Sequence, residues 1–367
     1  MLVLATSASA QRQISFAPFE LPESGSIVVP VPAGETPAGL AATLDSDTGG
    51  AIALAMTEAG FTGEKNQTLT LFGIKPYSRI DLIGVGPDPV NRVGAENFGG
   101  IAAGLKDGSS GTEVRVLWSG VDRTDDASAA RIAFGYRLRD YRFDRYFEDQ
   151  LDPETLGAVE ILSNDNSAEA RFDNDLGHVA AGVHLARDLS SEPGNVIYPQ
   201  SFVDRIRGEF SGVDDVTIRV LDEEDLEELG MGAHLGVGSG SDRPPRLLVI
   251  EYLAGGNQPV LALAGKGITF DSGGISLKNS DGMGRMKGDM SGAGVVAATV
   301  LATARRGASV NVVAFAALAE NLPSGSAIRP GDVLTSMSGK TIEINSTDAE
   351  GRLVLSDAVW YAQQEYE

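Results

Sequence analysis

Three short segments in the C-terminal half of the chain concentrate charged side chains among glycines. They are GKGITFDSGGISLK (residues 265–278), MKGDMSG (286–292) and NSTDAEGRL (345–353). The first leaves an apolar run typical of a buried strand and enters a predicted Gly-rich loop, where open α/β sheets bind their ligands. The carboxylates in these segments are candidate metal ligands, because the chain has no cysteine and only three histidines.

Charge repulsion limits how these carboxylates can share one pocket. Two carboxylates about 4 Å apart repel by about 4 kcal/mol at an effective dielectric of 20. Four of them around one pocket could not all stay ionised alone. Two divalent cations would cancel the four negative charges and remove this objection.

The third segment has a simple geometric interpretation. In an extended backbone, residues two apart point to the same side. Asp348, Glu350 and Arg352 would then share one face, just before a helix predicted over residues 354–361. An arginine beside a helix N-terminus favours an anion site.

Each of these residues also has an ordinary structural interpretation. Singly, the four carboxylates could be helix caps or solvated loop residues, and Asp289 stands where an N-cap belongs. Lys266 and Lys278 could be surface lysines, and Arg352 an ion-pair partner at the start of a helix. Their joint occurrence in these contexts favours the metal site.

Taken together, the three segments resemble the leucyl aminopeptidase family. The similarity extends over most of residues 185–359, including AENLPSG at 319–325, and is looser in the N-terminal half. The resemblance implies a metal-dependent aminopeptidase that hydrolyses the N-terminal residue, leucine and similar, from peptides. It implies a set of five ligands for two divalent metals: Lys266, Asp271, Asp289, Asp348 and Glu350.

The resemblance also divides these ligands between two sites. The tighter site would use Lys266, Asp271, Asp289 and Glu350, and the more exchangeable one Asp271, Asp348 and Glu350. Lys266 can act as a ligand only as a neutral amine, so its pKa must fall from about 10.4. Zn²⁺, Mn²⁺ or Mg²⁺ suits this oxygen-rich set, and the family most often implies zinc.

Lys278 and Arg352 match the family's two catalytic positions that do not bind metal. As a hypothesis, a water acidified by both ions attacks the scissile carbonyl, and Lys278 stabilises the oxyanion that develops. The resemblance implies that Arg352 holds a bicarbonate acting as general base. It also implies a hexamer.

Two features depart from the family pattern. Ser346 stands where the family usually has asparagine, which predicts a less firmly held loop. The chain also stops at Glu367, whereas family members continue, so we expect an incomplete catalytic sheet with an unpaired edge. The alternative function is therefore a catalytically impaired, truncated subunit with a structural or regulatory role.

Composition argues against two other classes of protein, those that bind nucleic acid and those that span a membrane. The formal net charge of −22, from 51 acidic and 29 basic residues, argues against nucleic acid as a partner. No apolar stretch is long enough for a membrane span. Residues 4–11 look like the end of a signal peptide, but the apolar run 1–5 is too short. We therefore expect residues 1–25 to be an N-terminal extension of a cytoplasmic protein.

The pattern of apolar runs predicts two α/β domains. We expect an N-terminal domain with a mostly parallel sheet (26–162), a connecting helix (163–195) and a larger catalytic domain with a central mixed sheet (196–367), incomplete at its C-terminus. The predicted strands are 27–31, 68–72, 80–85, 114–118, 216–220, 246–252, 259–264 and 310–315. The predicted helices are 38–60, 90–105, 126–143 and 293–304. The strands predicted at 246–252, 259–264 and 310–315 are near-continuous apolar runs, as expected for strands buried on both faces.

Other motifs favour structural roles. Residues 338–341 (SGKT) lack the first glycine of a phosphate loop, so a hairpin turn is the better account. Residues 236–240 (GVGSG) predict a flexible turn. Ser272 lacks the context of a nucleophile, and His178, His184 and His234 lie outside the metal segments.

Overall fold

A computed structural model describes residues 11–105, 113–148, 150 and 156–366. The chain divides into two units, residues 1–180 and 181–367. The division falls within the helix that we predicted as a connection, and the predicted domain bounds stay a prediction. Among the described residues, no helix is long and apolar enough to cross a membrane.

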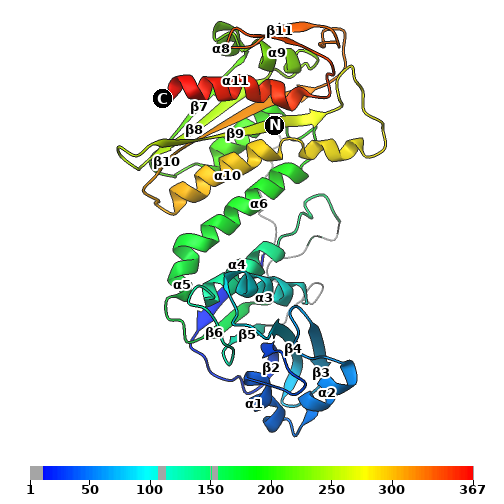
Figure 1. Cartoon of the computed structure of the whole chain (residues 1–367), viewed down its shortest axis with the longest axis vertical. Coiled ribbons are helices and arrows are strands. Elements are labelled where there is room, and N and C mark those ends of the chain that lie inside the picture. Colours follow the sequence, from blue (N-terminus) through cyan, green and yellow to red (C-terminus); the bar gives the residue numbers. More distant parts are fainter. Residues whose placement is uncertain (1–10, 106–112, 149, 151–155, 367) are drawn as a thin grey trace. The chain divides into compact units, whose positions relative to one another are not determined.

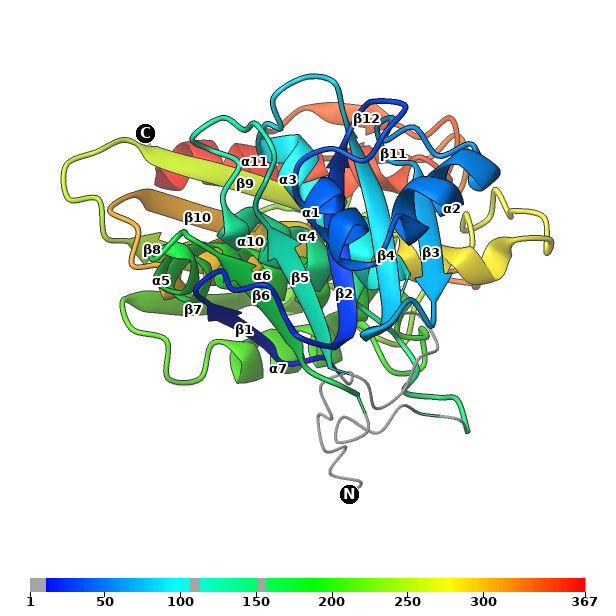
Figure 2. The same ribbon diagram turned by 90° about the horizontal axis from the view of Figure 1, so that it is seen from below.

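The first unit is built on a six-stranded sheet with the order β1-β6-β5-β2-β4-β3, which Figure 2 shows strand by strand. All neighbours pair in parallel except β3 and β4. The mostly parallel sheet is therefore confirmed. The strands are β1 (Ile14–Ala17), β2 (Gly25–Pro32), β3 (Thr68–Phe72), β4 (Tyr77–Gly86), β5 (Val114–Trp118) and β6 (Val159–Ser163).

Helices connect these strands and cover the sheet. They are α1 (Leu40–Asp47), α2 (Ala51–Ala59), α3 (Arg92–Gly104) and α4 (Ala129–Arg139). The predicted single helix over 38–60 is wrong, because Gly49 and Gly50 have φ angles of 67° and 86° that interrupt it. The first ten residues of the predicted extension lie outside the described residues, and β1 joins the sheet beside β6.

A long helical segment leads out of the first unit. It begins with α5 (Ala168–Arg171), passes through a π-helical turn (Phe172–Leu176) and continues as α6 (Gly177–Ser191). His178 and His184 both lie on α6, within the range predicted as a connecting helix.

The second unit has a four-stranded mixed sheet with the order β7-β8-β10-β9. Its strands are β7 (Val216–Leu221), β8 (Arg246–Leu253), β9 (Val260–Asp271) and β10 (Asn311–Asn321). β10 runs parallel to β9 and antiparallel to β8, so the mixed sheet is confirmed. β10 is buried at every position. β9 lies at the edge, and residues 260–264 are exposed or partly exposed, so the prediction of burial on both faces is wrong for 259–264.

Helices cover both faces of this sheet, as Figure 1 shows. The end of α6, α7 (Pro199–Glu209) and α10 (Ser291–Arg305) pack on one face, against the side chains of Val312, Ala314 and Ala316. α8 (Glu223–Glu228), α9 (Gly232–Gly238) and α11 (Glu350–Glu365) pack on the other, against Val313, Phe315 and Ala317. The alternation of β10 side chains thus supplies two cores.

Two glycine-containing motifs have different outcomes. Residues 338–340 lie in the predicted hairpin turn between β11 (Val333–Thr335) and β12 (Thr341–Glu343). Residues 236–238 belong to α9, so the predicted flexible turn is wrong there. A Cβ on Gly236 would lie 2.7 Å from Leu334 Cδ1, so this glycine permits close helix packing.

His234 on α9 is fully buried behind β10. Its Nε2 donates to the carbonyl of Leu318 at 3.0 Å, and its Nδ1 has no hydrogen-bond partner in the part of the chain that the structure describes. Burial lowers the pKa of His234 to about 4, against the raising effect of the Leu318 bond. The imidazole is therefore neutral at pH 7.

This burial predicts a loss of stability in acid. An unfolded His234 takes up a proton near pH 6.5 and the folded one only near pH 4, so stability falls as pH drops through that window. From these two values the loss at pH 5 is about 2 kcal/mol. The neighbouring Asp357 has a raised pKa from burial, which acts in the opposite direction. Urea unfolding of wild type and His234→Gln at pH 7 and pH 5 separates the contribution of His234 from that of Asp357, because both proteins contain Asp357. An equal pH dependence would contradict the prediction.

Candidate metal centre

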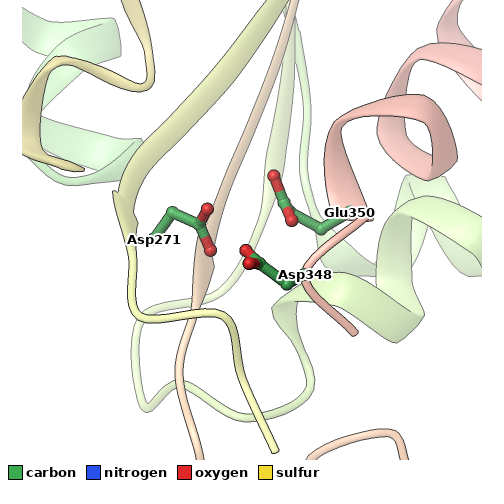
Figure 3. A group of neighbouring side chains, drawn as sticks. All are labelled: Asp271, Asp348 and Glu350. Atoms are coloured by element: carbon green, nitrogen blue, oxygen red, sulfur yellow. The ribbon is translucent and has the colours of Figure 1, made fainter. Parts of the chain in front are cut away.

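Three carboxylates meet at the carboxyl ends of β9 and β10. Asp271, Asp348 and Glu350 each offer an oxygen within 4.8 Å of the others'. Figure 3 shows the three side chains pointing toward one another from the end of β9, a loop and the start of α11. Asp271 and Glu350 are buried and Asp348 is partly exposed, so the cluster is open on one side.

Lys266 joins this cluster to the fourth carboxylate. Its Nζ lies 2.6 Å from Glu350 Oε1 and 2.7 Å from Asp289 Oδ2. Asp289 follows a 3₁₀ turn (Met283–Gly288) and precedes α10, whose N-cap is Met290. The structure thus brings together all five predicted ligands: Lys266, Asp271, Asp289, Asp348 and Glu350.

A bulge in β9 aims Lys266 and Asp271 at the same face. In a regular strand, residues five apart point to opposite faces. The pairing with β10 skips Thr269, since Ile268 pairs with Ala319 and Phe270 with Glu320. The extra residue restores the common face. The predicted Gly-rich loop is therefore wrong up to Asp271, because β9 extends to that residue.

Lys278 lies on the open side of the cluster. Its Nζ is 2.9 Å from Asp271 Oδ2 and also contacts Asp348 Oδ1. The loop that carries it is held by Gly273 and Gly274, both with positive φ. A Cβ on Gly274 would lie 2.6 Å from Asn321 Oδ1, so only glycine fits without movement.

Two polar residues that we did not predict hold the carboxylates and their loops in place. The Asn321 side-chain amide donates to Asp271 Oδ1 at 2.8 Å, to the Thr347 carbonyl at 2.9 Å and to Glu350 Oε2 at 3.4 Å. Thr347 Oγ1 donates to the Gly273 carbonyl at 2.6 Å. The signal for Asn321 was its place in AENLPSG at 319–325, a segment that resembles the family.

The last segment is not extended as far as predicted. α11 begins at Glu350, so Glu350 and Arg352 lie in its first turn, and the shared extended face is wrong. Arg352 is exposed and forms no ion pair with any described residue. Ser346 Oγ accepts the backbone N–H of Asp348 at 3.2 Å, so serine still ties this loop.

The two lysines offset only part of the negative charge. Four carboxylates face two ammonium groups. Burial lowers the pKa of Lys266, but its bonds to Asp289 and Glu350 outweigh burial, and the net shift is upward. Burial also raises the pKa of Asp289, against the effect of Lys266, and the charges of Asp271 and Glu350 add to the rise. Additional positive charge would stabilise all four ionised carboxylates.

Two local features fit a pair of divalent ions. Oδ2 of Asp289 is buried and, apart from its ion pair with Lys266, has no hydrogen-bond partner among the residues described. Gly351 leaves space around the Lys266 side chain, because a Cβ there would lie 2.7 Å from Cδ and 3.1 Å from Nζ. Carboxylate oxygens and one amine form a donor set suited to Mn²⁺, Mg²⁺ or Zn²⁺.

The space at Gly351 leads to a prediction. Gly351→Ala should displace Lys266 and weaken divalent-metal binding by about tenfold. Alanine is favoured in helices by about 1 kcal/mol over glycine, so the melting temperature should not fall. Calorimetric titration with Mn²⁺ measures the change. Gly208→Ala in α7, where a Cβ meets nothing within 4 Å, is the matched control. Equal affinities in the two variants would refute this role for Gly351.

Two family models match the chain. The catalytic domain of the cytosol aminopeptidase family matches residues 184–367, and the N-terminal domain of the same family matches residues 28–150.

Curated relatives share much of the chain. It is 41% identical to a probable cytosol aminopeptidase of Caulobacter vibrioides over 87% of this chain and 65% of that protein. It is 43% identical to the probable cytosol aminopeptidase of a Bradyrhizobium species, over 89% of this chain and 67% of that protein. It is 39% identical to the probable cytosol aminopeptidase of a Chelativorans species, over 96% of this chain and 72% of that protein. The chain thus spans about two thirds of the length of these relatives.

Solved structures share the fold. A mutant of tomato leucine aminopeptidase superposes with a TM-score of 0.84 at 29% identity, over 98% of this chain and 73% of that chain. A bottromycin maturation enzyme in complex with Mn superposes with a TM-score of 0.75 at 28% identity, over 93% and 69%.

Proposed function

Because the chain belongs to the cytosol aminopeptidase family, we propose that it acts as a metal-dependent aminopeptidase. The substrates are peptides with a free N-terminus, from which it releases leucine and similar residues. The convergence of five side chains carries this proposal, since Lys266 and Glu350 lie 84 positions apart and meet at 2.6 Å.

The ligand set of the proposal consists of Lys266, Asp271, Asp289, Asp348 and Glu350. Two divalent ions bound there would supply the Lewis acidity that peptide-bond hydrolysis requires. Asn321 orients two of the carboxylates, and Gly351 leaves room for the Lys266 side chain. With ions bound, Lys266 would act as a ligand as a neutral amine.

Lys278 and Arg352 have roles toward the substrate in this proposal. Lys278 lies at the partly exposed side of the cluster, next to Asp348, where its ammonium group can stabilise negative charge on the carbonyl oxygen under attack. The exposed guanidinium of Arg352 can hold a bicarbonate through paired N–H donors and so place a general base near the cluster.

The finer assignments rest on the family alone. Zn²⁺ or Mn²⁺ is the proposed metal pair, with Mg²⁺ as the third candidate. A homo-oligomer, as a hexamer, follows from the family resemblance. A cytoplasmic location completes the proposal and is supported by the name of the relatives.

Metal content and hydrolysis together test the proposed function. We expect two equivalents of divalent metal per chain by plasma mass spectrometry, and release of nitroaniline from leucyl p-nitroanilide that EDTA abolishes and Mn²⁺ restores. Metal uptake without hydrolysis would favour the alternative, a structural or regulatory subunit. A folded sample that takes up no metal would contradict the metal centre itself.

A further inference from the structure

A second pocket lies at the same edge of the sheet, on the opposite face from the carboxylate cluster. Its volume is about 460 Å³, within the range of small-molecule sites. Phe270 and Glu320 line it, whereas the next residues in each strand, Asp271 and Asn321, belong to the cluster. Successive strand side chains point to opposite faces, so the pocket and the cluster lie back to back.

Arg243 is held rigidly in this pocket. Its guanidinium lies over the Tyr198 ring at 4.2 Å from the centroid, and its Nη1 donates to the Gly194 carbonyl at 2.9 Å and to Glu320 Oε1 at 3.0 Å. Its Nε and Nη2 donate to no described residue, and 39% of the side chain is exposed. A fixed arginine with free, planar donors is suited to a carboxylate.

The buried Glu320 is fully satisfied and does not compete for a ligand. Arg243 binds its Oε1, and Ser241 Oγ donates to its Oε2 at 2.5 Å. Asp242 also lines the pocket, is exposed, and pairs with no cation in the described part of the chain. It follows Ser241 and precedes Arg243, so its Cα lies about 3.8 Å from that of Arg243.

The pocket therefore presents the unused N–H donors of Arg243, whose charge is paired with Glu320, and the carboxylate of Asp242, which is unpaired among the described residues, on one lining. Phe270 and Leu322 add apolar walls. A phosphate dianion would meet the carboxylate of Asp242, and a metal ion would meet the Arg243 cation, so both fit poorly. A zwitterion that carries its ammonium and carboxylate groups on the same carbon atom fits both groups.

We propose that this pocket binds a free α-amino acid with an apolar side chain. Its carboxylate binds Nε and Nη2 of Arg243, its ammonium group binds Asp242, and its side chain packs on Phe270 and Leu322. The choice of leucine as ligand rests on the proposed function, whose product is such an amino acid. The pocket itself rests on the geometry.

Calorimetric titration with L-leucine tests this site in the full chain. The Glu350→Gln variant in EDTA serves as the host, because leucine can then gain nothing from bound metal. We expect saturable binding there. N-acetyl-leucine, which lacks the ammonium group, and leucinamide, which lacks the carboxylate, should each bind about tenfold more weakly.

Protein variants assign each charge. Asp242→Asn should weaken leucine binding about tenfold. It should leave the binding of N-acetyl-leucine unchanged, since that ligand has no ammonium group to contact Asp242. Arg243→Lys keeps the charge but not the planar donors. This change should weaken the binding of leucine and leave the binding of leucinamide unchanged. Asp214→Asn, an exposed carboxylate elsewhere in the same unit, is the matched control.

Absence of leucine binding in the Glu350→Gln host would overturn the proposal, as would binding that Asp242→Asn leaves intact. Because Arg243→Lys also alters the pair with buried Glu320, the ligand analogues and Asp242→Asn keep the test valid if that variant unfolds. None of these outcomes depends on hydrolysis, so a failed pocket and a failed aminopeptidase are distinguishable.

Discussion

Glu350→Gln should bind divalent metal at least about 100-fold more weakly than wild type. Glu350 contacts Lys266 through Oε1 and Asn321 through Oε2, and it lies in the cluster with Asp271 and Asp348. Together with Asp271, it is one of the two carboxylates that the ligand assignment gives to both metal sites. Glutamine keeps the shape but removes the charge, so both proposed ions lose a ligand.

The fold should survive this change. Removing one of several mutually repelling carboxylates relieves part of the repulsion that remains when metal is absent. Circular dichroism checks the fold, and calorimetric titration with Mn²⁺ measures the affinity. Glu228→Gln, on the exposed side of α8, makes the same chemical change outside the site. Equal affinities for the two variants would remove Glu350 from the metal centre.

Lys278→Ala should lower turnover of leucyl p-nitroanilide by about 10²–10³-fold, the loss that follows removal of one donor to an oxyanion. Its Nζ pairs with Asp271 and Asp348. If metals take over these carboxylates, the ammonium group is released toward the substrate.

Metal content should stay at two ions per chain in Lys278→Ala, because all five ligands remain. Lys340→Ala, an exposed lysine at the hairpin turn between β11 and β12, is the control. Undiminished turnover would contradict the catalytic role. A loss of metal alongside turnover would instead mean that Lys278 supports the ligands.

The sequence alone predicted the architecture and the membership of the cluster to a large extent. Apolar runs such as 68–72 and 114–118 coincide with β3 and β5. The charged, glycine-containing segments named every charged side chain of the cluster at the sheet edge, because each segment combines a charge with the backbone freedom that a tight site requires.

Long-range pairing explains what the sequence could not reveal. Thr269 looks like any β-branched strand residue, and only its pairing with β10 makes it the bulge that brings Lys266 and Asp271 to one face. The start of α11 at Glu350 likewise overrides an alternation of charges that read as extended. Asn321 carries no charge, so its three hydrogen bonds appear only once β10 lies beside β9.

Tertiary packing also reversed two local patterns. Glycines at 236 and 238 suggest a turn, but each allows close contact of α9, with Leu334 and Pro245 respectively. The apolar run at 259–264 suggests a strand buried on both faces, yet β9 lies at the sheet edge, with Leu261 60% exposed. Neither partner could be identified from local composition.

Crystals soaked in Mn²⁺ would test the metal centre most directly, through anomalous diffraction. Our account predicts two anomalous peaks, both in contact with Glu350 and Asp271, one also with Lys266 and Asp289 and the other with Asp348. A map without peaks among these five side chains, from crystals in which Mn²⁺ is bound elsewhere, would contradict it.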